Sequence, residues 1–138
     1  MFKKLWSNKP LIGLVIFSII VAILNPRFLS MANILNVLRQ TSINSIIAIG
    51  MTFVILTGGI DLSVGSILAF CGAVMAYLLN TGLNPLIALI ITLVLGMIFG
   101  FFNGFLVSVM KLQAFIVTLV TMTFLRGATL VFTNGKPI

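Results

Sequence analysis

Five stretches of almost uninterrupted apolar residues alternate with short polar segments along the chain. Each stretch approaches or exceeds the ~18–20 residues with which a helix spans a bilayer. A helix satisfies its own backbone hydrogen bonds in lipid, and the stretches lack the apolar/polar alternation of membrane β-strands. The pattern therefore predicts an all-α, polytopic integral membrane protein. The expected spans are residues 8–25, 43–57, 62–79, 86–109 and 114–133.

The polar segments predict where these helices end and begin. Asn25-Pro26 closes the first span, because proline disfavours helical geometry in the residue before it. Thr57-Gly58-Gly59 breaks the second span, and Asp61 is expected to cap the third. Residues 80–85 form a turn. The mixed segment 28–40 predicts a short helix lying at the membrane surface.

The N-terminal region allows a second interpretation. Lys3, Lys4 and Lys9 precede a short apolar run, and Ser30-Met31-Ala32 is a conceivable cleavage site, which together are also typical of a signal peptide.

Composition and charge agree with a membrane protein. The chain is 61% hydrophobic and 7% charged, with a mean hydropathy of +1.33. Its net charge of +7 comes from eight basic residues set mostly singly between apolar runs, so we interpret them as topology signals and contacts to lipid headgroups, and not as a nucleic-acid surface. The N-terminus is expected in the cytoplasm. Lys3, Lys4, Lys9 and Lys111 then lie inside, and Arg27, Arg39 and Lys136 outside.

The residue inventory argues against an enzyme. The chain has no histidine, one cysteine (Cys71) and one acid (Asp61), so it offers no acid/base pair and no metal cluster. No phosphate-binding loop motif occurs either. We expect no catalytic residue, no metal site and no cofactor bound by this chain. ATP, if it is used, is hydrolysed by a partner.

Small residues recur at helical spacing in two spans. Gly96, Gly100 and Gly104 form a ladder beside Asn103, and Gly65 and Gly72 share a face of the third span. Such spacing lets helices approach closely in lipid. These glycines would serve either the packing of helices within the chain or an interface between subunits, and the sequence leaves both alternatives open.

Two groups of polar residues fall at membrane depth. Gly58, Gly59, Asp61 and Ser63 form a helix break, which would either cap the following helix or line and gate a path. The second group shares a face of the last span and includes the charged Arg126. Because a charge is costly in lipid, Arg126 is expected either to line a translocation path or to make a structural contact. Its members are Thr123, Arg126 and Thr129.

Several segments closely resemble a known family. Residues 47–66 contain Gly-Gly-Ile-Asp-Leu-Ser-Val-Gly-Ser, and residues 28–39, 115–127 and 132–138 fit the same pattern in register. They resemble the permease subunits of bacterial ribose-type sugar ABC importers. The resemblance implies an inner-membrane permease that provides a path by alternating access. It also implies four kinds of partner: a second permease subunit, cytoplasmic ATPase subunits, a periplasmic sugar-binding protein and membrane lipid.

Members of that family are usually much longer. Residues 1–138 are therefore expected to be the N-terminal portion of one transmembrane permease domain, an incomplete half of a larger bundle. Two alternatives remain: a stand-alone small membrane carrier or channel-forming oligomer, and a non-functional truncated remnant.

Overall fold

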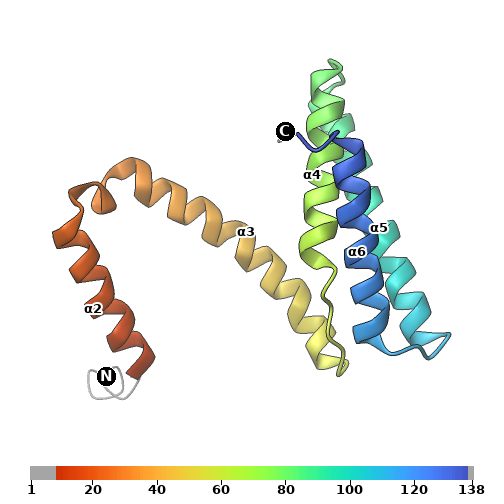
Figure 1. Ribbon diagram of the computed structural model, residues 1–138, viewed down its shortest axis with the longest axis horizontal. Coiled ribbons are helices and arrows are strands. Elements are labelled where there is room, and N and C mark those ends of the chain that lie inside the picture. Colours follow the sequence, from red (N-terminus) through yellow and green to blue (C-terminus); the bar gives the residue numbers. More distant parts are fainter. Residues whose placement is uncertain (1–8, 137–138) are drawn as a thin grey trace. The chain divides into compact units, whose positions relative to one another are not determined.

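The computed structural model describes residues 9–136, and within them every regular element is a helix, as predicted. The chain divides into two compact units, residues 1–48 and 49–138, with the division inside one long helix. Figure 1 shows the helices of both units, coloured along the chain. The elements are α2 (Lys9–Leu24), η1 (Pro26–Leu29), α3 (Met31–Leu56), α4 (Val64–Asn80), α5 (Pro85–Ser108) and α6 (Ala114–Phe132).

The first unit contains α2, the 3-10 turn η1 and the first part of α3. Helix α2 ends at Leu24, and the Asn25 side chain then accepts a hydrogen bond from the Arg27 amide at 3.1 Å. Asn33 closes the corner by donating to the Phe28 carbonyl at 2.7 Å. The predicted end of the first span at Asn25-Pro26 is confirmed. Lys3 and Lys4, on which the predicted orientation partly rests, lie outside the described residues.

Helix α3 is continuous over 26 residues, so the separate surface helix expected over 28–40 is wrong. The mixed polarity of residues 28–40 suggested a separate helix, but no glycine or proline interrupts residues 31–42. Ser42 instead donates to the Leu38 carbonyl at 2.8 Å, inside the helix. Polar side chains of this kind are accommodated in a helix without ending it.

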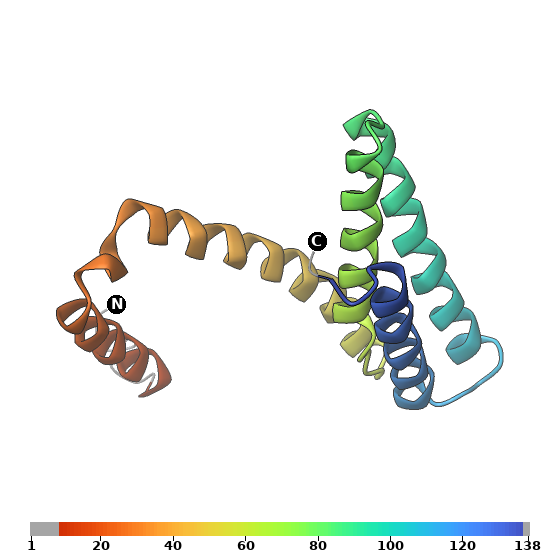
Figure 2. The ribbon, with the colours of Figure 1, turned by 45° about the horizontal axis from the view of Figure 1, so that its top comes forward.

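In the second unit, α4, α5 and α6 lie side by side (Figures 1 and 2). Phe70 of α4 packs edge-on against Phe99 of α5, with ring centroids 5.8 Å apart, and also contacts Phe132 of α6. The fully buried Leu125 belongs to the same bundle. Most other large apolar side chains are exposed, as expected of helices whose outer surfaces face lipid or further helices.

Three of the described helices are long and apolar enough to cross a membrane: α3, α5 and α6. Helices α2 and α4 are equally apolar but have 16 and 17 residues. Helix α4 is short because its first predicted turn is not helical. It begins at Val64, with Ser63 as N-cap, so the assignment of Asp61 as the capping residue is wrong. Asp61 lies two residues earlier, in an extended segment.

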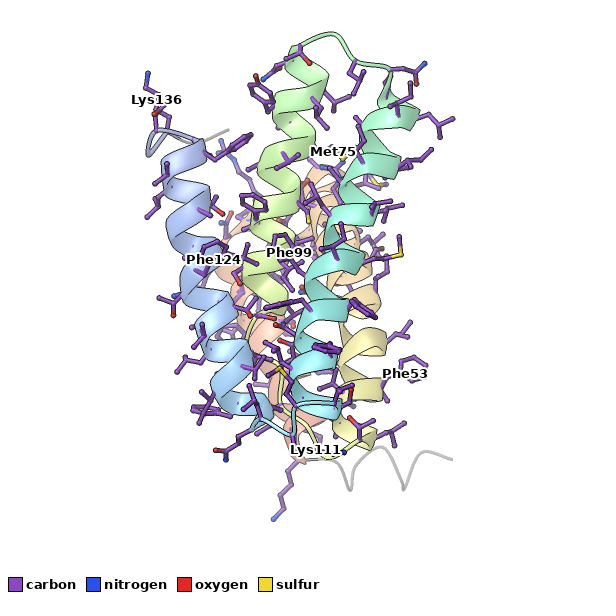
Figure 3. All side chains as sticks on the ribbon, turned by 90° about the vertical axis from the view of Figure 1, so that its right-hand side faces the viewer. Phe53, Met75, Phe99, Lys111, Phe124 and Lys136 are labelled. Atoms are coloured by element: carbon purple, nitrogen blue, oxygen red, sulfur yellow. The ribbon has the colours of Figure 1, made fainter. Side chains whose placement is uncertain are left out.

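Two of the three basic residues of this unit lie at opposite ends of α6. Lys111, in the connection between α5 and α6, lies at one end of the bundle, and Lys136 follows the other end of the helix (Figure 3). The turn at Thr57–Gly59 shares a groove with Ser108 and Ala114, so it belongs to the Lys111 end. Helix α6 has 19 residues, about 28 Å at ~1.5 Å per residue, which is close to the ~30 Å apolar thickness of a bilayer.

We therefore expect the two ends of α6 to be labelled from opposite sides of the membrane. In a Cys71→Ala background, Gln113→Cys should react with an impermeant thiol reagent only from the cytoplasmic side, and Lys136→Cys only from the outside. Gln113 is used because it is exposed and directly precedes α6. Labelling of both from one side would contradict a spanning α6.

Candidate functional site

The candidate site is the break between α3 and α4. Gly58 has a φ of +75°, a left-handed conformation that glycine adopts without strain. The Gly59 amide donates back to the Val54 carbonyl at 3.1 Å, which closes the end of α3. The Thr57 hydroxyl donates to the same carbonyl at 2.7 Å. The glycine pair thus turns the chain sharply and leads it into the extended residues that precede α4.

Asp61 and Ser63 form a tight turn in the non-helical segment that precedes α4. One carboxylate oxygen of Asp61, Oδ1, accepts hydrogen bonds from both the Ser63 amide at 2.7 Å and the Ser63 hydroxyl at 2.6 Å. Hydrogen bonds to an ionised acceptor are shorter and stronger than neutral ones. The pair therefore fixes the conformation of the chain immediately before α4.

A chain of side-chain hydrogen bonds continues from this turn into the neighbouring helices. The Asn103 amide of α5 donates to Ser63 Oγ at 2.9 Å, and the Thr121 hydroxyl of α6 donates to Asn103 Oδ1 at 2.7 Å. Ser63 is fully buried, and Asn103 and Thr121 are almost so. Every donor in the series Thr121–Asn103–Ser63–Asp61 points toward the carboxylate. We call these four residues the polar relay.

Two further hydroxyls support the same segment. Thr118 of α6, also buried, donates mainly to its own helix at the Ala114 carbonyl (2.8 Å) and lies 3.3 Å from the Ile60 carbonyl. Ser66 donates to the Ser63 carbonyl at 2.7 Å. Within residues 9–136, no buried side-chain nitrogen or oxygen lacks a partner. Non-helical backbone is tolerated at membrane depth only where protein or water surrounds it, and these contacts meet that requirement.

A cavity of about 170 Å³ opens next to the break, and a groove of about 740 Å³ adjoins it on the side of the α5–α6 connection. Asp61, Asn103 and Thr118 line the cavity only, whereas Gly58 and Phe105 line the groove only. The residues that line both are Thr57, Gly59, Gly104, Val107 and Ala114.

The structure separates the sequence-predicted path residues into two groups. Gly58, Gly59, Asp61 and Ser63 lie together at the break. The others lie along α6, where Thr123 and Thr129 donate to carbonyls of their own helix and Arg126 is exposed. Thr129 borders a separate groove between α4 and α6. The path role of both groups stays a prediction.

The glycines predicted to pack helices differ in their surroundings. A Cβ placed on Gly96 would lie 3.8 Å from Cys71 Sγ of α4, so this glycine faces a neighbouring helix. A Cβ on Gly65, Gly72, Gly100 or Gly104 would meet no atom of the described chain within 4 Å. Packing at these four positions also stays a prediction.

Sequence reasoning missed Thr118 and Thr121. The available signal was their spacing: both lie on the face of α6 that also carries Val117 and Leu125, all four being buried. The charge of Arg126 is the more conspicuous feature of this apolar span, and it lies on a different face. Two hydroxyls on the same helix face as Val117 and Leu125 are the pattern expected of a buried polar contact between helices.

A polytopic helical bundle with a break between two of its helices, braced by buried polar side chains, is an architecture of membrane transport proteins. Comparison with known families agrees: residues 33–136 match the branched-chain amino acid transport system/permease component family, and the chain belongs to it.

The chain is 52% identical to the ribose import permease protein RbsC of Haemophilus influenzae over 136 residues, which is 99% of this chain and 42% of that protein. It is 55% identical to the RbsC of Bacillus subtilis over 129 residues, 94% of this chain and 40% of the relative. The inner membrane ABC transporter permease protein YjfF of Escherichia coli is 50% identical over 115 residues, 82% and 35% of the two chains. The chain thus spans about two-fifths of the length of these relatives. No solved structure matches it.

Two threonines of α6 provide a matched test of the polar relay. Thr121→Val removes a hydroxyl that bonds Asn103 of another helix, whereas Thr123→Val removes one that bonds its own backbone. Because interhelical hydrogen bonds in membranes contribute roughly 0.6–2 kcal/mol, Thr121→Val should lower the free energy of unfolding by about that amount. Thr123→Val should have little effect. Equal losses in reversible detergent unfolding would contradict the relay.

Proposed function

We propose that this chain forms part of the permease subunit of an ATP-driven importer of ribose or a related monosaccharide. The observation that carries the proposal is the identity of 52–55% to two ribose import permeases over nearly the whole chain. The family description names branched-chain amino acids, but a family of this breadth includes members with different substrates. The ribose relatives match the chain in detail, and they favour a sugar.

In this proposal the chain contributes to a path that opens alternately to each side of the membrane. The break at Gly58–Ser63 supplies a conformationally adaptable glycine pair next to a cavity. Broken helices of this kind expose backbone and side-chain polar groups to a substrate path. The face of α6 that carries Thr123, Arg126 and Thr129 is a second, separate candidate for path lining.

The energy source and the partners follow from the same proposal. The sequence carries no phosphate-binding loop motif, so ATP would be hydrolysed by separate cytoplasmic ATPase subunits. A second permease subunit, a periplasmic sugar-binding protein and membrane lipid complete the expected assembly. The name of the Escherichia coli relative supports the inner membrane as the location. The N-terminus is expected in the cytoplasm.

A chimeric permease tests the function. Residues 1–138 would replace the aligned stretch of the Haemophilus influenzae ribose permease, in a strain that lacks its own ribose permease but retains the other subunits. We expect the chimera to restore uptake of labelled ribose, because about half of the replaced residues are identical.

The intact Haemophilus influenzae permease serves as the positive control, and leucine as the control substrate, since the family description names branched-chain amino acids. A chimera that is present in the membrane at the level of the control and transports leucine, or transports neither compound, would contradict the proposal.

A further inference from the structure

The two carboxylate oxygens of Asp61 have different surroundings. Oδ1 accepts both hydrogen bonds from Ser63, and the described residues donate none to Oδ2. No buried side-chain oxygen in residues 9–136 lacks a partner, so Oδ2 is not sealed inside the protein. Asp61 is half-buried and lines the 170 Å³ cavity. One oxygen of this carboxylate is thus fixed, and the other remains free to accept a hydrogen bond from a ligand.

The cavity has room for a polar ligand. A water molecule occupies ~30 Å³ in the liquid, so 170 Å³ corresponds to several waters. The adjoining groove provides a way in from the side of the α5–α6 connection. The walls are mainly small or apolar residues, with Thr57, Asn103 and Thr118 beside the carboxylate. A few placed polar groups in a mostly apolar hollow are typical of small-molecule sites.

We propose that Asp61 Oδ2 is a contact point for a hydroxyl group of a neutral sugar in this cavity. The inference rests on the proposed function, and it adds a substrate contact to a segment that could otherwise serve only as a hinge. A sugar hydroxyl is a donor without charge, and a carboxylate is the strongest acceptor that a side chain offers it.

The negative charge also sets a specificity. Asp61 is the only acidic residue of the chain, and its neighbours in the cavity are uncharged. A sugar phosphate would bring its own negative charge close to the carboxylate, and like charges at short range repel each other. The site should therefore accept a free sugar and reject its phosphorylated form.

The polar relay makes Ser63 and Asn103 positioning residues for this contact. Their hydrogen bonds hold Oδ1 in place, and the orientation of the carboxylate directs Oδ2. A contact group held in advance loses less conformational freedom when a ligand binds. Ser63 is fully buried, so it acts through Asp61 and does not itself reach a ligand.

Protection of a cysteine in the cavity tests the contact directly. In the chimera with Cys71→Ala, Thr57→Cys places a thiol in the wall of the cavity that contains Asp61. The variant would be solubilised in detergent, so that both sides are accessible, and labelled with a neutral thiol reagent. Millimolar ribose should slow the labelling several-fold, and ribose 5-phosphate should leave it unchanged.

Asp61→Asn and an off-site cysteine provide the controls. Asparagine keeps an Oδ1 acceptor for Ser63 but loses the charge, so the protection by ribose should disappear while the labelling rate without sugar stays the same. Thr81→Cys, at the exposed end of α4 and outside both the cavity and the α6 face, should show no protection. Absence of protection by ribose, equal protection in Asp61→Asn, or equal protection by ribose 5-phosphate would overturn the inference.

Ribose uptake by the same chimera separates the two proposals. Normal uptake without protection would refute the contact and leave the permease function standing. Absence of uptake in an assembled chimera would refute the function itself.

Discussion

The hydrogen bond from Asn103 to Ser63 is the contact on which the second unit depends. It joins residues 40 positions apart in the sequence, and it links a non-helical segment to the last turns of α5. Lipid offers no partner to the polar groups of such a segment, so the protein has to supply them. Asn103 donates a hydrogen bond to Ser63, and Thr121 of α6 orients Asn103 by donating to its side-chain oxygen. The break between α3 and α4 is stable because the side chains of Ser63, Asn103 and Thr121 meet there.

Much of the fold follows from the pattern of apolar residues. The all-helical class, the end of the first helix, the glycine break and the turn before α5 were all predictable, since they depend on local residues such as Pro26, Gly58 and Pro85. The continuity of α3 was not, because the polar residues at 39–42 resemble a helix end, although none is a glycine or proline and Ser42 bonds within the helix. Local signals identify strong breakers well and mild polar interruptions poorly.

The site was only half predictable for a related reason. Asp61 and Ser63 attract attention by their chemistry and their place beside two glycines. Their partners Asn103 and Thr121 lie on other helices, and which faces meet is decided by packing across the bundle. Sequence position alone also misassigned Asp61 as the cap of α4. Its carboxylate instead forms a turn with Ser63 and fixes the approach to that helix.

The relay connects this structure to the proposed transport role. A glycine hinge and a carboxylate in a mostly apolar bundle need neighbouring groups that define their conformations. The series of hydrogen bonds from Thr121 to Asp61 does this for both. Membership of a permease family and the likeness to ribose permeases support the proposal that this arrangement serves transport. The same arrangement leaves one oxygen of Asp61 available for a sugar.

A double-mutant cycle between Ser63→Ala and Asn103→Leu tests the central contact most directly. The free energy of unfolding would be measured in detergent for both single variants and for the double variant. The hydrogen bond predicts that the two losses are not additive, with a coupling of roughly 1 kcal/mol between the positions. Strictly additive losses would contradict the claim that Asn103 holds the helix break in place through Ser63.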